Sequence, residues 1–342
     1  MSRDAAVDGH LPGGPGGRDR DDELRVALEE LQAGRWLAMA TMLARSDVGW
    51  ELRTERTKAL ALVAYRSNVT STWISEQPDN ADARVMHARA MVERALRAGR
   101  QQRGEVRELE DLARSACETA SRMAPADPVP WVDLIALAEL DGRQDRPEHR
   151  VPAPERSLLS PGPWGLLAES HRRHPFNREA YHRMLRFWHA MPGDVGLGRG
   201  VDYVRWVSSW VPVSSPLSVL PLYAYVEQYR RQRDAGRLDP LLRRQWDRGH
   251  IADDVARSLA WFDQLAAHPA SLLDLNHLAH ALWAGSRFED AGRVFTAIGP
   301  FAVRLPWAHV ADRPELAERE FQWARRQCLK SRRAPVRHRA RT

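Results

Sequence analysis

Apolar residues recur with the period of an α-helix along most of this chain. At the start of the pattern, Leu24, Leu28 and Leu31 lie three and four residues apart, a spacing that gathers them on one face of a helix. The same period predicts helices in the second half over 164–171, 179–190, 201–210, 217–235, 240–246, 251–267, 272–283, 289–298 and 314–328. No segment has the alternation of a β-strand, so the pattern predicts an all-α fold.

Three polar junctions of similar design separate predicted helices, at 77–83, 125–128 and 174–180. Each contains a proline that blocks extension of the preceding helix, and an Asp or Asn that can cap the following one. The junctions recur at uneven intervals of about fifty residues, which is typical of helical pairs of unequal length.

Around these junctions the sequence resembles the tetratricopeptide repeat family, in which small and aromatic residues hold fixed places along a helical pair. The first-helix places are matched by Trp131, Leu134, Ala138 and Gly142, and the second-helix small places before the junction by Ala113 and Ala120. A further unit matches in order at Leu278, Ala279, Leu282, Gly285, Phe288, Ala291 and Phe295. The resemblance covers about half of the chain as scattered units.

The resemblance implies an α-solenoid of irregular antiparallel helix pairs whose concave face binds a protein or peptide. In that register Asn276, His280 and Trp283 would face the groove, and Arg89 would occupy the corresponding place in an earlier unit. We therefore expect an intracellular, non-enzymatic scaffold with a protein or peptide partner.

Composition changes along the chain predict its domain organisation. Residues 1–22 are rich in Gly, Pro and charge and predict a disordered segment. Residues 23–142 then form N-terminal helical repeats, and residues 143–163 a proline-rich linker or inserted loop. C-terminal helical repeats follow over 164–328, and a basic disordered tail over 329–342.

The positive charge of the chain is concentrated at its end. The formal net charge is +6, but eight Lys and Arg residues and no acidic residue follow Glu320, which leaves residues 1–320 at −2. The tail contains Lys330, Arg332, Arg333, Arg337, Arg339 and Arg341. Such arms attach to nucleic acid through charge alone, so a nucleic-acid-associated regulator is the alternative function.

Candidate catalytic and cofactor patterns are weak. Glu179 and His182 have the Glu-x-x-His spacing of di-iron helices, but no matching second pair with inward glutamates accompanies them. The glycine run at 193–200 lacks the Gly-Lys-Ser/Thr ending of a phosphate-binding loop and predicts a turn between helices. The sequence therefore predicts no catalytic residue, metal or cofactor.

The sequence also lacks the features of a membrane or exported protein. The N-terminal segment has no apolar stretch of the kind that signal peptides contain. Cys117 and Cys328 are the two cysteines and lie far apart in the sequence, which suits a reducing compartment. We expect a cytoplasmic protein that does not bind membranes.

Overall fold

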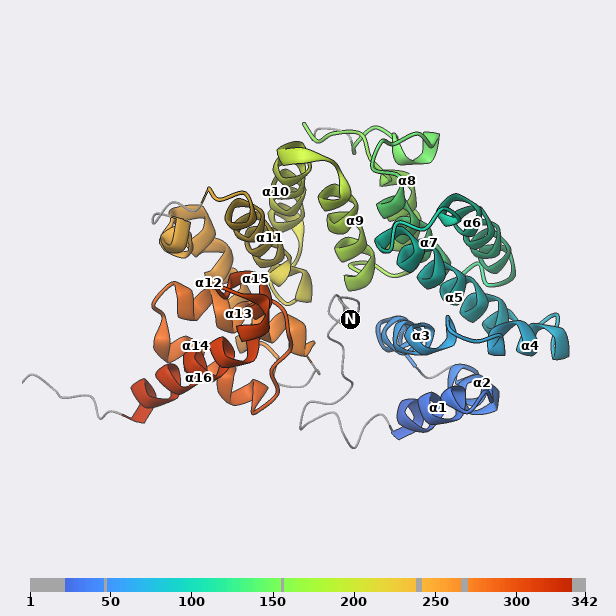
Figure 1. The fold of residues 1–342 in the computed structure, drawn as a ribbon, viewed down its shortest axis with the longest axis horizontal. Coiled ribbons are helices and arrows are strands. Elements are labelled where there is room, and N and C mark those ends of the chain that lie inside the picture. Colours follow the sequence, from blue (N-terminus) through green and yellow to red (C-terminus); the bar gives the residue numbers. More distant parts are fainter. Residues whose placement is uncertain (1–21, 46–47, 155–156, 238–241, 266–269, 334–342) are drawn as a thin grey trace, which may run out of the picture. The chain divides into compact units, whose positions relative to one another are not determined.

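The computed structural model describes residues 22–45, 48–154, 157–237, 242–265 and 270–333. Within these ranges every extended regular element is a helix (Figure 1), and one isolated antiparallel bridge joins Val151 to Gly162. The prediction of an all-α fold is therefore confirmed. The chain divides into an N-terminal unit, residues 19–203, and a C-terminal unit that begins at Val204.

The N-terminal unit is built from nine complete helices and the start of a tenth, among its described residues. They are α1 (Asp22–Gln32), α2 (Leu37–Leu43), α3 (Trp50–Ala64), α4 (Val69–Glu76), α5 (Ala81–Arg100), α6 (Val106–Met123), α7 (Val129–Leu137), α8 (Trp164–Arg173), α9 (Arg178–Ala190) and α10 (Gly193–Trp210). Short 3-10 turns follow at Ala138–Leu140 and Pro147–His149. Trp73 anchors one core cluster and stacks on Trp36 with ring centroids 5.4 Å apart, an aromatic contact that adds to the burial of apolar area.

Side-chain caps are present at the first and third junctions, and at the middle junction an Asp side chain accepts from the first amide of the helix. The side chain of Asn80 accepts a hydrogen bond from the Ala83 amide at the start of α5, and that of Asn177 accepts one from the Ala180 amide in α9. At the middle junction, Asp127 Oδ1 accepts from the Val129 amide at 2.8 Å. Local capping chemistry was thus readable from the sequence because it depends on neighbours within three residues.

Substituting Asn80 by alanine is expected to lower the free energy of unfolding by about 1 kcal/mol, because an amide at the N-terminus of α5 loses its acceptor. Denaturant unfolding followed by circular dichroism measures the change. Asn80→Asp is the matched control, since it keeps a side-chain oxygen at the same position. Equal losses in the two variants would contradict the capping role.

The proline-rich segment 143–163 belongs to the N-terminal unit. Its Arg146 donates to Glu110 on α6 at 2.7 Å, and Arg114 of α6 donates to Glu148 at 2.6 Å. His149 is fully buried, with Nδ1 2.8 Å from a carboxylate oxygen of Asp141. The segment around Arg146 and His149 is therefore packed against α6, and the division between the units falls within α10 rather than at the prolines.

The glycine run at 193–200 opens helix α10 instead of forming a turn. Gly196 explains why glycine is needed there: a Cβ at this position would lie 2.4 Å from the carbonyl oxygen of Trp188. The missing side chain lets the first turn of α10 approach the end of α9 closely. Our prediction of a turn was wrong because glycine lowers helix propensity without excluding a helix where close packing requires it.

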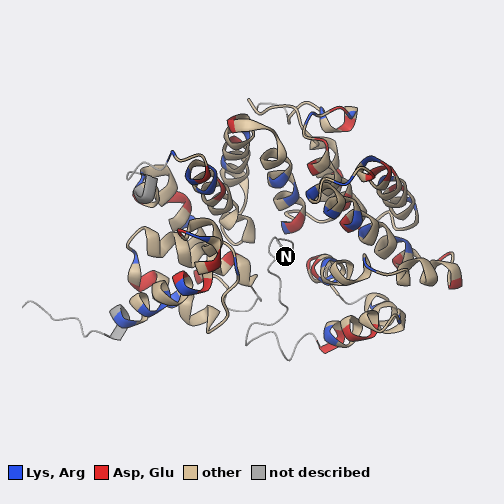
Figure 2. Ribbon diagram, in the orientation of Figure 1, with Lys and Arg blue, Asp and Glu red and all other residues tan. Residues whose placement is uncertain are grey.

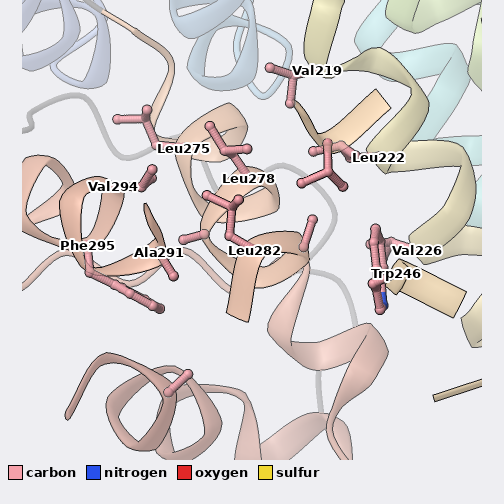
Figure 3. Packing of buried hydrophobic residues seen from close by; sticks show 14 of the residues in the cluster. Val219, Leu222, Val226, Trp246, Leu275, Leu278, Leu282, Ala291, Val294 and Phe295 are labelled. Carbon is pink, nitrogen blue, oxygen red and sulfur yellow. The ribbon is translucent and has the colours of Figure 1, made fainter. Parts of the chain in front are cut away.

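The C-terminal unit contains six complete helices among its described residues. They are α11 (Leu220–Asp234), α12 (Gly249–Asp263), α13 (Leu272–Ala284), α14 (Phe288–Ile298), α15 (Trp307–Val310) and α16 (Ala317–Arg333). Short 3-10 turns lie at Pro216–Val219, Leu242–Asp247 and Pro314–Leu316. Apolar side chains of α11, α13 and α14 meet in its core (Figure 3), among them Leu222, Leu278 and Phe295.

The last helix is longer than the sequence predicted. We expected it to end at Cys328, but α16 continues to Arg333, so residues 329–333 are helical. Acidic side chains occupy its first turn and basic ones gather toward its end (Figure 2), an order that complements the helix dipole. Arg337, Arg339 and Arg341 lie outside the described residues, as does the predicted disordered segment up to residue 21.

In the part of the chain that the structure describes, no helix is both long and apolar enough to cross a membrane.

Candidate functional site

The four residues predicted to line a groove have different environments. Arg89 and Asn276 are buried, with exposed fractions of 2% and 0%. Asn276 donates to the Leu272 carbonyl at 2.8 Å and accepts from Trp307 Nε1 at 2.9 Å. Placing these two residues in an open groove was therefore wrong: both satisfy polar groups inside the protein, as buried polar side chains generally must.

Arg89 lies at the centre of a buried charge cluster in the N-terminal unit. Its guanidinium donates from α5 to Asp133 of α7 at 2.8 Å, to the Thr54 carbonyl at 3.2 Å, and to Glu179 of α9. Arg183 of α9 extends the cluster, with contacts of 3.2 Å to Glu179 and 3.3 Å to Glu93. One guanidinium on α5 thus contacts three other helices, α3, α7 and α9.

The pKa values of the two carboxylates that face Arg89 are shifted in opposite directions. Burial raises the pKa of Asp133 to about 7, an effect that Arg89 only partly offsets. Burial would also raise the pKa of Glu179, but the positive charges of Arg89, Lys58 and Arg183 outweigh it and lower the value to about 2. Glu179 is therefore the firmly ionised partner, and the cluster is an internal ion-pair network that holds α5, α7 and α9 together.

His280 and Trp283, the other two predicted residues, line a cavity of about 400 Å³ in the C-terminal unit. A cavity of this size accommodates a small ligand or a side chain of a partner. We call it the aromatic pocket; it is lined by Tyr229, Trp246, His280, Trp283, Ala284, Phe288, Val310, Ala311, Asp312, Glu320, Trp323 and Gln327.

The rings of the aromatic pocket stand at steep angles to one another. His280 lies edge-on to Trp246, with centroids 5.1 Å apart and planes at 83°. Trp283 meets Trp323 at 5.3 Å and 84°. Trp283 is held in place by a hydrogen bond of 2.9 Å from its Nε1 to Gln327 on α16, so the wall of the pocket is fixed by side chains from separate helices.

His280 is an unsatisfied polar group in this wall. Its side chain is 2% exposed, and no described residue forms a hydrogen bond with its Nδ1. Burial, reinforced by the nearby His277, lowers the pKa of His280 to about 3. The imidazole is therefore neutral at pH 7 and keeps one nitrogen able to accept a hydrogen bond.

The charged side chains that line the aromatic pocket are both acidic. Asp312 is exposed and Glu320 is partly buried. Burial raises the pKa of Glu320, the Asp312 carboxylate raises it further, and Arg319 opposes them. Neither carboxylate is in an ion pair with another described residue, and none of the pocket-lining residues is Lys or Arg. The pocket therefore combines aromatic faces with negative charge.

The remaining candidates from the sequence do not form a site in the described chain. No three His, Cys, Asp or Glu side chains lie together as metal ligands among the described residues, and Glu179 is engaged with Arg89 and Arg183. Lys330 is exposed on the last turns of α16. Binding of nucleic acid by the basic tail stays a prediction, since no structural feature bears on it.

Comparison with known proteins adds no family to this description: no family model matches the chain, and no curated protein or solved structure is significantly similar to it.

Proposed function

We propose that this chain is an intracellular, non-enzymatic helical scaffold of the tetratricopeptide type, and that its C-terminal unit binds a protein or peptide partner at the aromatic pocket. The observation that carries the proposal is the pocket itself. Aromatic residues that line a preformed cavity, with a few polar groups among them, are the usual composition of a binding site.

The α13–α14 pair supports this assignment. Ala279, Leu282 and Phe295, which carry the resemblance to the repeat family, are all buried where α13 and α14 pack. Phe288 lies at the start of α14 and lines the pocket. The positions that define the helical pair thus also position the pocket wall.

A partly exposed tryptophan at the rim gives a partner a place to make contact. Trp323 is 49% exposed and lies against Trp283. Tryptophan is enriched among the residues that contribute most to binding at protein interfaces, so Trp323 is the contact that we expect a partner to cover.

Site-specific photocrosslinking in cells tests the proposal. A photoreactive phenylalanine analogue at Trp323 should crosslink a discrete partner, and the same probe at Trp210 should not. Trp210 is the matched control because it is also partly exposed in the C-terminal unit but does not line the pocket. The Trp323 product should disappear when Trp283→Ala is introduced. Absence of a product, or its persistence with Trp283→Ala, would refute the proposal.

A further inference from the structure

The aromatic pocket has a composition that selects for charge as well as for apolar surface. Trp246, Trp283 and Trp323 offer ring faces and edges around the cavity, and Asp312 and Glu320 lie beside them. The face of an aromatic ring carries negative partial charge and attracts a cation within about 6 Å of its centroid. The rings and the carboxylates therefore both attract a positively charged ligand.

The rings of the pocket pack on one another and on neighbouring aromatic side chains, but the described chain places no cation of its own over them. Arginines stack on rings elsewhere in the chain, as Arg97 does on Tyr65 and Arg173 on Trp131. No Lys or Arg of the described residues stacks on the tryptophans of the pocket. A cation in the pocket would thus have to come from outside the described chain.

The ring geometry favours a rounded cation over a flat one. Near-perpendicular pairs, His280 with Trp246 and Trp283 with Trp323, turn ring faces in different directions. A planar guanidinium stacks best on one face or between parallel faces, whereas a tetrahedral alkylammonium group presents positive charge and apolar surface on every side. The buried, neutral His280 adds an uncharged wall with an unpartnered Nδ1, which does not repel a cation.

We infer that the aromatic pocket binds an alkylammonium cation, presented as an N-alkylated lysine side chain of the peptide partner. The inference rests on the proposed function and names the chemistry that the same site would recognise. The alkyl groups contact the tryptophan rings, and Glu320 and Asp312 at the rim neutralise the charge.

Titration of the full-length protein with choline, followed by calorimetry, tests the charge requirement. The matched ligand is the neutral isostere of choline in which a tert-butyl group replaces trimethylammonium. Choline should bind about tenfold more tightly than this isostere, since the cation–π attraction of a desolvated ring acts only on the charged ligand. Equal affinities, or no binding of choline, would overturn the inference.

Variants of the pocket residues test whether choline binds in the aromatic pocket. Trp283→Ala should weaken choline binding by about tenfold, and Glu320→Gln by about threefold, with the larger loss from the residue that offers a ring face. Trp210→Ala should leave the affinity unchanged, because it lies outside the pocket. If Trp210→Ala and Trp283→Ala weakened binding equally, choline would not be bound in the pocket and the inference would fail.

A peptide pair identifies the form in which the cation is presented. A peptide that contains trimethyllysine should bind the wild-type protein more tightly than choline and than the same peptide with unmodified lysine. If choline bound more tightly than both peptides, the peptide-borne source would be wrong. The results distinguish failure of this inference from failure of the proposed function. If choline binds no more tightly than its isostere but the Trp323 crosslink still forms, only the cation chemistry is wrong. If choline binds but no crosslink forms, the proposed protein partner is wrong.

Discussion

Replacing Arg89 by alanine is expected to lower the free energy of unfolding of the N-terminal unit by about 3–5 kcal/mol, because it removes the counter-charge of the buried Asp133 and one of the counter-charges of the buried Glu179. Asp133 and Glu179 are 2% and 7% exposed. Glu179 would keep Arg183 at 3.2 Å, while Asp133 would lose its one ion-pair partner among the described residues and become protonated near neutral pH. Hydrogen exchange of the amides in α5, α7 and α9 measures the loss where it arises.

Arg25→Ala provides the matched control for this prediction. Arg25 also pairs with two carboxylates, Asp22 at 3.3 Å and Glu29 at 2.9 Å, but its side chain is 60% exposed. An ion pair at the surface contributes little to stability, because water already solvates both charges. Similar losses in Arg25→Ala and Arg89→Ala would show that burial does not amplify the Arg89 contacts.

Arg89→Lys separates charge from geometry. Lysine restores the positive charge but has one compact ammonium group, whereas the guanidinium reaches Asp133, Glu179 and the Thr54 carbonyl at once. We expect the lysine variant to recover only part of the lost stability, since the two side chains are not equivalent where several acceptors must be contacted. Full recovery would mean that charge alone holds the three helices.

The features that the sequence predicted well are local ones. Helices and their caps depend on residues a few positions apart, which is why the oxygens at Asn80, Asp127 and Asn177 could be anticipated. Arg89 shows the limit of the same reasoning. A single arginine in a helix is normally solvated, and its burial depends on Glu179, ninety residues away in sequence, which no local pattern reveals.

The aromatic pocket was predicted only in part for the same reason. The register of 272–283 identified His280 and Trp283, but Trp246 and Trp323 reach the cavity from other elements. The abundance of tryptophan signals large anchors between helices; it does not say which of them leave a space between them. Only the packing of α13 against its neighbours distinguishes a filled core from a lined cavity.

Replacing Trp307 by alanine is expected to destabilise the C-terminal unit, because this tryptophan lies in the core behind the aromatic pocket. Trp307 is fully buried and lies 5.5 Å from the rings of both His280 and Phe321. Trp307→Ala should therefore lower the free energy of unfolding by about 3–5 kcal/mol, through lost burial and the cavity left behind. Chemical denaturation of the full-length chain, followed by circular dichroism, measures it.

Two further substitutions measure how much stability depends on the Trp307 hydrogen bond and on the rim of the pocket. Trp307→Phe keeps a ring but removes the donor to Asn276 Oδ1, and leaving that buried oxygen unpaired should cost about 1–3 kcal/mol. Trp323→Ala, which truncates the 49% exposed ring at the rim, should change stability by less than about 1 kcal/mol and yet weaken choline binding. A stability loss for Trp323→Ala as large as that for Trp307→Ala would mean that the rim is part of the core. In that case the pocket would be a packing defect and not a binding site. A ring that serves binding can be removed without unfolding the helices behind it, whereas a ring of the core cannot.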